Sequence, residues 1–339
     1  MMIFNLKYLT LLGLFIFLLG LFQSRMVWSE TLEIRDSRGR LLTVSADPGK
    51  VVALSLTSLE IICLLGQSHR IAAATNYMSG HANQFPFLGS LPKIGDAFNP
   101  NLEVLVKLQP DLLITWVNYP GPELERRLEP FGIDILRFNF TRPDRLQPET
   151  RTLAKIFGSN ALVRAIKYAD FCQKHENSIK ERIKVSQLKP TLVIEHVIKN
   201  RVATATTGIS NLARILEAKN FGDAFTNDNS TEVDSEWFVR RNPSHLVRDF
   251  NWRKRENESE RRKMAAAIRA EILGRPGWQN IEAIKNQKVL VIDLDLTEGA
   301  RYVLGLYKMA HFLYPDIVAH DEWRSVETEY RTKFLDNNN

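Results

Sequence analysis

The stretch Asn101–Thr115, NLEVLVKLQPDLLIT, shows how this chain alternates between helices and strands. Asn99 or Asn101 can cap a helix that begins there, because an Asn side chain accepts a hydrogen bond from a free amide of the first turn. The helix must stop before Pro110, since the residue ahead of a proline is disfavoured in the α region. The apolar run DLLIT that follows is typical of a buried strand. A helix that leads directly into a buried strand predicts an α/β fold.

The same alternation continues on both sides of this unit. Upstream, KVVALSL (50–56) and RIAAATN (70–76) read as buried strands, and the first is followed by the capping-box pattern TSLE (57–60). Downstream, PELERRLEPFG (122–132) predicts a helix and IDILRFN (133–139) another strand. TLEIRDSRGRLLTVS (31–45) predicts a hairpin. Residues 30–148 are therefore expected to form one α/β lobe around a parallel, doubly wound sheet.

The alternation is interrupted after Pro148 and resumes near residue 187. Residues 149–186 predict a helical connector whose second helix runs from about Ala161 to Val185, or ~37 Å at the α-helical rise. Residues 187–320 again alternate, with strands expected in PTLVIEHV, SHLVRDF and KVLVIDLD. We therefore predict an α/β protein of two Rossmann-like lobes with mainly parallel sheets. A single long helix is expected to join the lobes, and residues 321–339 are expected to form a disordered tail.

The opening unit has a near-repeat in the second lobe, DSEWFVRRNPSHLVRDF (234–250). Glu103 precedes Pro110 by seven residues, and Glu236 precedes Pro243 by the same interval. Two such carboxylates could act as a glycosidase pair, but they would then have to lie ~5–10 Å apart across a cleft. The predicted topology instead places one on each lobe. The chain also lacks GxSxG, GxxxxGK[ST], GxGxxG and CxxC motifs, so an enzyme is not expected.

The first 29 residues have the pattern of a cleavable signal peptide. The apolar run from Tyr8 to Phe22 is shorter than the ~20 residues needed to span a bilayer, so a membrane anchor is the weaker alternative. Val27 and Ser29 occupy the −3 and −1 positions of a small-residue cleavage site, and no Cys lies near it for lipid attachment. We therefore expect an exported, periplasmic protein. Cys63 and Cys172 are expected to be free thiols, because Cys63 lies in an apolar run and neither has a CxxC partner.

Charge and histidine content argue against two further classes of function. The formal net charge is +6, which is mild for a nucleic-acid-binding protein. The seven histidines are scattered, only His81 and His196 fall near expected cleft loops, and no HxH or HExxH motif occurs. We expect neither a nucleic-acid partner nor a bare metal site.

Several segments carry a family pattern in a fixed order. They are VVALSLTSLEIICLLG, LPKIGDAFNPNLEVLVKLQPDLLITW, TTGISNLARILEAKNFGDAF, GRPGWQNIEAIKNQKVLVID, and the helix from Arg301 to LYPD. Together they resemble the substrate-binding proteins of ABC importers for iron–siderophore complexes, haem and cobalamin, the class III group whose lobes are joined by one helix. The resemblance covers nearly the whole chain after residue 29, and its order and spacing are more specific than any single motif.

The resemblance implies partners and a docking surface. In that family one Glu on the outer surface of each lobe forms a salt bridge with an Arg pocket on the membrane permease, and the matching positions here are Glu103 and Glu236. The expected partners are thus an ABC permease and its ATPase at the inner membrane, served by a monomeric binding protein. The alternative for each Glu is that the helix dipole alone favours an acid in the first turn.

The resemblance also implies a ligand cleft between the lobes, where ligand binds at loops leaving the C-terminal ends of the strands. The residues expected to contact it are Tyr77, Phe98, Trp116, Tyr119, His196, Trp252 and Arg301. Aromatic rings would supply flat apolar contact, and Arg301 could pair with ligand carboxylates or phosphate. Each residue has a structural alternative: Trp116 as a core residue, His196 as a satisfied buried imidazole, and Arg301 as an interlobe ion pair.

The implied ligand is an iron complex (a siderophore or haem) or cobalamin, with no cofactor besides this cargo. Two alternatives stay open at the level of sequence. One is an oxyanion such as molybdate or tungstate, bound by helix N-termini and hydroxyls in the same fold. The other is an exported module that senses its ligand without transporting it.

Overall fold

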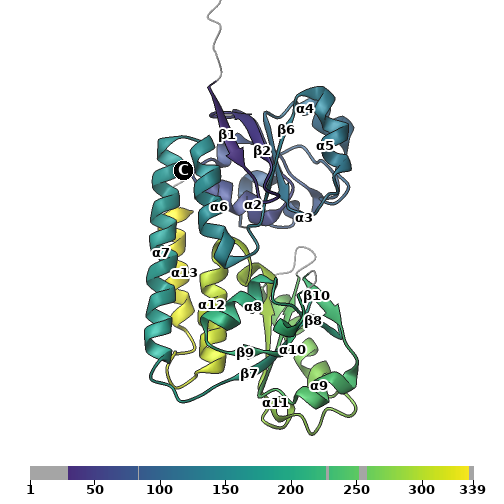
Figure 1. The fold of residues 1–339 in the computed structure, drawn as a ribbon, viewed down its shortest axis with the longest axis vertical. Helices are drawn as coiled ribbons and strands as arrows, with labels where there is room; N and C mark the ends of the chain where they lie inside the picture. The colour runs from purple at the N-terminus through teal and green to yellow at the C-terminus, as the bar shows by residue number, and fades with distance from the viewer. Residues whose placement is uncertain (1–29, 83, 227–228, 252–257, 336–339) are drawn as a thin grey trace, which may run out of the picture.

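The computed structural model describes residues 30–82, 84–226, 229–251 and 258–335. Figure 1 shows two α/β lobes, one above the other, with long helices running past both of them along one side. In these ranges, no helix is both long enough and apolar enough to cross a membrane. The predicted two-lobed α/β architecture is confirmed.

The N-terminal lobe is built on a four-stranded parallel sheet with the strand order β4-β3-β5-β6. Strands β3 and β5 bury every residue except the last one of β5, as expected for parallel strands covered on both faces. The elements of this lobe are the hairpin β1 (Thr31–Arg35) and β2 (Leu41–Ser45), strands β3 (Val51–Ala53), β4 (Ile71–Ala73), β5 (Leu112–Trp116) and β6 (Asp134–Phe138), and helices α2 (Leu56–Leu64), α3 (Asn76–Ser79), α4 (Leu102–Leu108) and α5 (Glu123–Leu128).

The C-terminal lobe has a mixed sheet with the order β10-β8-β7-β11-β12, and β9 also pairs with β7. Its centre is parallel, whereas β8 pairs antiparallel with both β7 and β10. The elements of this lobe are strands β7 (Thr191–His196), β8 (Arg201–Ala203), β9 (Lys219–Asn220), β10 (Ser230–Glu232), β11 (His245–Phe250) and β12 (Val289–Asp293), and helices α8 (Gly208–Ile215), α9 (Ser235–Arg241), α10 (Glu258–Leu273) and α11 (Glu282–Lys285). The short strands β8, β9 and β10 were not predicted, because two or three residues carry no readable period.

A layer of four helices connects the lobes: α6 (Pro143–Ile156), α7 (Ser159–Ile183), α12 (Tyr302–Leu313) and α13 (Glu322–Phe334). The connector begins at Pro143 rather than at residue 149, since a proline fits the first turn of a helix. The expectation that residues 321–339 form a disordered tail is wrong for α13. This helix returns along α7 toward the N-terminal lobe and buries Val326, Tyr330 and Phe334. Its apolar positions recur every four residues, which is the spacing of an amphipathic helix.

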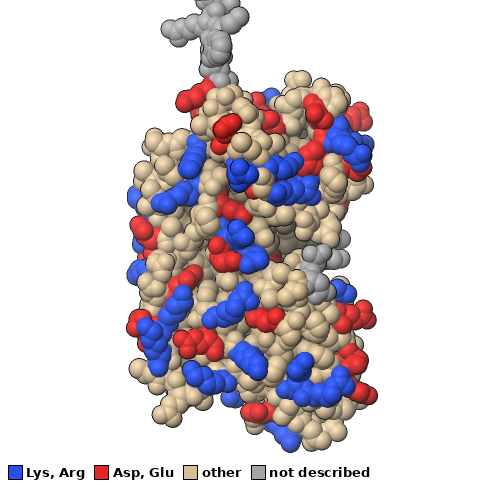
Figure 2. Space-filling model, in the orientation of Figure 1, with Lys and Arg blue, Asp and Glu red and all other residues tan. Residues whose placement is uncertain are grey.

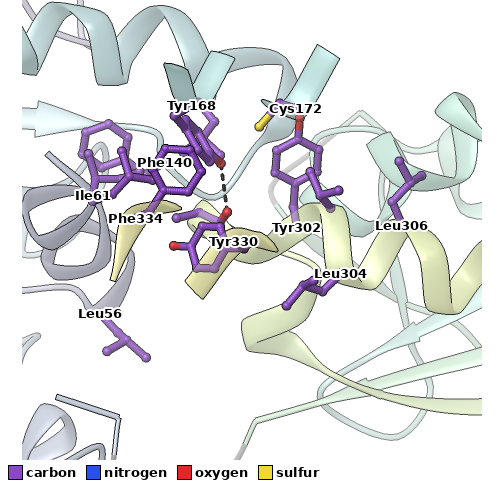
Figure 3. Packing of buried hydrophobic residues seen from close by; sticks show 14 of the residues in the cluster. Leu56, Ile61, Phe140, Tyr168, Cys172, Tyr302, Leu304, Leu306, Tyr330 and Phe334 are labelled. Atoms are coloured by element: carbon purple, nitrogen blue, oxygen red, sulfur yellow. Dashed lines mark hydrogen bonds between the residues drawn. The ribbon is translucent and has the colours of Figure 1, made fainter. Parts of the chain in front are cut away.

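The core of the helical layer is aromatic (Figure 3). Tyr168 and Cys172 of α7, Tyr302 of α12, and Tyr330 and Phe334 of α13 are all buried there. The Tyr168 hydroxyl donates to the carbonyl of Ala300 over 3.0 Å, so its polar atom has a partner. Both cysteines are buried free thiols, as predicted. Burial raises the pKa of Cys172 to about 12, which keeps this thiol protonated and unreactive.

Candidate functional site

Loops that follow the parallel strands of the two lobes face each other. The Tyr77 hydroxyl, after β4, donates to Oδ1 of Asn251, after β11, over 3.1 Å. Nε2 of His81 lies 3.4 Å from Oδ2 of Asp295, after β12. The C-terminal ends of both sheets therefore meet at one interlobe cleft, the expected place for a ligand in such folds. Figure 2 shows the surface recessed between the two lobes, on the side away from α7.

Three of the predicted ligand contacts lie together in the N-terminal lobe. Phe98 and Trp116 stack with ring centroids 5.2 Å apart and planes 5° apart. Tyr119 meets Phe98 edge-on, with centroids 5.7 Å apart. We call Phe98, Trp116 and Tyr119 the aromatic platform. Phe98 is 59% exposed and Tyr119 is 54% exposed, so the platform presents apolar ring surface to solvent.

A buried arginine fixes the end of β5 and the loop after it, which carry two of the three platform residues, Trp116 and Tyr119. Arg137, fully buried in β6, donates to the carbonyls of Trp116 over 2.9 Å and Gly121 over 3.2 Å. Its charge is balanced by Glu125, whose Oε1 lies 2.6 Å from Nε. Burial alone would raise the pKa of Glu125, but the bonds from Arg137 outweigh it and the pKa is lowered. Sequence reasoning missed this support, although an Arg inside the apolar strand IDILRF was a readable signal.

Arg301 is paired within the protein rather than open to a ligand. Its Nε lies 2.9 Å from Oε1 of Glu60 in α2, and its Nη2 lies 3.8 Å from Oδ2 of Asp295. The Arg301 side chain is 16% exposed and that of Glu60 only 4%. Burial lowers the pKa of Arg301, but the nearby Glu60 and Asp295 carboxylates raise it further, so the guanidinium stays charged. The geometry is that of the interlobe ion pair, the alternative to a ligand contact.

His196 is a largely buried imidazole that supports a strained turn. Its Nδ1 lies 2.7 Å from Oδ2 of Asp249, while the amide of Val197 donates to Oδ1 of Asp249 over 2.7 Å. Burial lowers the pKa of His196, but the Asp249 carboxylate outweighs it and the pKa is raised. Val197 has a φ of 53°, which is costly for a β-branched residue. Strain of this kind persists where surrounding contacts hold it in place.

The turn after β7 also presents an apolar residue that sequence reasoning missed. Ile198 is 60% exposed, and its amide donates to the His196 carbonyl over 2.5 Å. The turn is held by buried Glu195, which accepts from the amide of Asn200 over 2.6 Å and pairs with Arg275 over 2.8 Å. A lone Ile in a loop carries no signal in a single sequence. Ile198 thus adds a second exposed apolar surface, in the C-terminal lobe, at the C-terminal end of a strand.

The remaining predicted sites stand as follows. Trp252 lies outside the described residues. In those residues, no three His, Cys, Asp or Glu side chains converge to hold a metal ion.

Half-buried Glu298 lies near His196 and Asp249, and loss of solvent around its carboxyl raises the pKa of Glu298 to about 8. The cleft wall of the C-terminal lobe therefore contains an acid that is largely protonated at neutral pH.

Helices α4 and α9 match each other in detail. The Asn101 side chain accepts from the amide of Val104, and that of Asp234 accepts from the amide of Trp237. Each helix has seven residues and ends at a left-handed C-cap, Gln109 in α4 and Asn242 in α9, directly ahead of a proline. Glu103 and Glu236 are both exposed in the first turn. Figure 1 places α4 and α9 in different lobes on the side of the molecule away from α7.

Comparisons with known proteins agree with this geometry. The family model described as periplasmic binding protein matches residues 51–296. An uncharacterized ABC transporter substrate-binding lipoprotein of Bacillus subtilis, YvrC, is 23% identical over 84% of this chain and 85% of its own.

Two solved structures share the fold at low sequence identity. CeuE of Helicobacter pylori with Ni(II) bound has a TM-score of 0.73 and 21% identity, covering 91% of this chain and 97% of that one. The molybdate-bound periplasmic binding protein MolA of Haemophilus influenzae has a TM-score of 0.71 and 18% identity, covering 89% and 97%. Both agree with two lobes of the class III type. The chain belongs to the periplasmic binding protein family and is a substrate-binding component of an ABC transporter, not an enzyme.

Proposed function

We propose that this protein binds an iron complex (a siderophore or haem) or cobalamin in the interlobe cleft and delivers it to an ABC permease. The aromatic platform carries this proposal. A stacked pair of exposed rings offers flat apolar contact to a macrocycle or a chelate ring. A small tetrahedral oxyanion is bound by hydrogen-bond donors and gains nothing from flat apolar contact. Molybdate is therefore the weaker candidate, although MolA shares the fold.

The proposal includes how the protein reaches its permease. A cleaved signal peptide within residues 1–29 exports it to the periplasm, where it acts as a monomer. Glu103 and Glu236 then contact the permease, one from each lobe. Their support is the matched capping of α4 and α9, their exposure, and their placement on one side of the molecule. Glu236 also forms a 3.3 Å pair with Arg240, which a permease arginine would have to replace.

The ligand is tested by what copurifies with the protein. Haem, cobalamin and ferric siderophores have distinct visible spectra, so the absorbance and mass of the bound molecule identify it. Protein stripped of ligand is then titrated with each candidate and with molybdate, using tryptophan fluorescence as the signal. We expect quenching by a coloured complex and no response to molybdate. A colourless preparation that binds only molybdate would contradict the proposal.

A further inference from the structure

A cavity of about 770 Å³ lies within the C-terminal half of the chain, apart from the aromatic platform. All of its lining residues fall between Phe250 and Glu327, and none comes from the N-terminal lobe. Its volume is in the range of binding sites for small molecules or short peptides. The cavity is therefore separate from the cleft wall that carries the platform.

The cavity follows the outer edge of β12. Consecutive residues of this strand line it, including Leu290, Val291 and Ile292. Because side chains alternate between the two faces of a strand, a cavity touched by consecutive residues must run along the backbone edge. β12 is the last strand in the described order of the sheet, with β11 on its other side. We call this cavity the β12 groove.

Part of this edge is open to an added strand. The Lys288 carbonyl accepts from the amide of Leu246 in β11, so in a parallel ladder the main-chain groups of Val289 and Val291 point outward. Arg269 donates to the outward carbonyl of Val289 over 3.2 Å. No described residue is recorded as a partner for the outward main-chain groups of Val291. Such an edge is a template for pairing with another chain.

Helices from both faces of the sheet form the walls of the β12 groove. Val289 packs in one apolar cluster with Ile268 and Leu273 of α10. Ile292 belongs to the other cluster, together with residues of α12 and α13. The wall residues are Arg261, Arg262 and Ala265 from α10, Lys308, His311 and Phe312 from α12, and Trp323, Arg324 and Glu327 from α13. A strand placed here would continue the sheet between its two helical layers.

The lining of the β12 groove has more basic than acidic residues. It contains six Lys or Arg residues and two Asp or Glu residues. Arg301 is paired with Glu60 and Asp295, and Arg261 lies 3.7 Å from Asp293, so Lys288 and Arg324 are the cations that the groove offers to an occupant. Lys308 lies 3.5 Å from the centre of the Trp323 ring, which orients its ammonium group at the wall. A basic lining favours an acidic occupant.

We propose that the β12 groove binds an extended acidic peptide segment of a partner protein, which adds to β12 as a further strand. Main-chain hydrogen bonds to Val291 supply affinity, and acidic side chains facing Lys288 and Arg324 supply selectivity. A second copy of this chain fits less well, because pairing two β12 edges would bring two basic linings together.

The full chain can be tested with a labelled peptide in which Glu and Val alternate, using fluorescence anisotropy at low salt. We expect binding that weakens as salt rises. The same peptide with N-methyl groups on alternate amides keeps its charge but cannot pair with a strand edge. We expect it to bind at least about tenfold more weakly. Equal binding of both peptides, or no binding of either, would overturn the proposal.

Variants separate strand addition from simple charge attraction. Val291→Pro removes an outward N–H while leaving the β11 ladder intact, as prolines on edge strands do, and should abolish binding. Lys288→Glu with Arg324→Glu should weaken the acidic peptide about tenfold and admit a Lys/Val peptide. Lys263→Glu with Lys285→Glu makes the same charge change at exposed positions outside the groove. This control should change the affinity for neither the Glu/Val peptide nor the Lys/Val peptide.

Two further measurements keep the result interpretable. Urea unfolding of each variant shows whether it is folded. If Val291→Pro does not fold, the charge variants alone decide the outcome. Sedimentation of the wild-type protein tests for dimers. A dimer that disappears in Val291→Pro would mean that the edge serves self-association, and the proposed occupant would be wrong.

Discussion

Trp116 is the residue on which the proposed ligand site depends most directly. It ends β5, stacks on Phe98, and is held through its carbonyl by Arg137. Trp116→Ala should weaken ligand binding by 10- to 100-fold, or ~1.4–2.8 kcal/mol, because the ring surface is lost. Isothermal titration calorimetry with the copurified ligand measures the two affinities, and its signal does not depend on tryptophan fluorescence. Phe131→Ala removes a ring that is 54% exposed outside the platform, and its affinity should match the wild type.

His245 gives the protein a predictable response to acid. It is buried at the start of β11, its ring meets Phe312 edge-on, and its Nε2 has no hydrogen-bond partner among the described residues. Burial, assisted by Lys288, lowers the pKa of His245 to about 4, against about 6.5 for an ordinary histidine. The unfolded chain therefore binds more protons than the folded one between these values. The free energy of unfolding should fall as pH drops through this window, by at most ~1.4 kcal/mol per unit.

Urea unfolding across this pH range tests the assignment. His245→Leu keeps an apolar side chain against Phe312 and should remove part of the pH dependence. His196 acts in the opposite sense, because its raised pKa gives stability that is present at low pH and lost as pH rises. An unchanged slope in His245→Leu would mean that this imidazole is not the titrating group.

At the scale of elements, α13 is a core helix rather than a tail. Phe334 is 1% exposed and meets Tyr168 edge-on with centroids 5.7 Å apart, and its carbonyl accepts from Arg164. Phe334→Ala should lower the free energy of unfolding by about 3–5 kcal/mol, as for other buried aromatic truncations. Thr328→Ala, at an exposed position of the same helix, should change it by less than about 0.5 kcal/mol. Equal stability of the two variants in urea would show that α13 does not pack as described.

Element types were largely readable from the sequence, and their partners were not. The α4–β5 unit was predicted because its signals are local: a cap, a run of apolar residues, and a proline. The partner of Arg301 could not be read in this way, since Glu60 lies 241 positions away. The platform was predicted as separate residues. Its stacking depends on how the segment ahead of α4, which carries Phe98, meets the end of β5, which carries Trp116.

At the scale of the whole molecule, the two lobes present matching docking helices. Glu103→Ala with Glu236→Ala should leave ligand affinity unchanged and abolish uptake, because both side chains are exposed in the first turns of α4 and α9 and neither belongs to the aromatic platform. Ligand-stimulated ATPase activity of the reconstituted transporter measures this. Glu129→Ala with Glu282→Ala removes the same charge at exposed positions in each lobe and should transport normally. Full transport by the first variant would rule out docking through this pair.

The sequence by itself determined the two α/β lobes, the long helix between them, the family, and the residue types at the strand ends. These follow from caps, breakers and apolar periods, which act over a few residues. Only the tertiary structure decided that Arg301 pairs with Glu60, that α13 packs in the core, and that β12 forms the floor of a basic groove. Each of these depends on residues far apart in the chain, brought together by burial of the lobes and helices against one another. A buried charge or an open strand edge has meaning only once its surroundings are fixed.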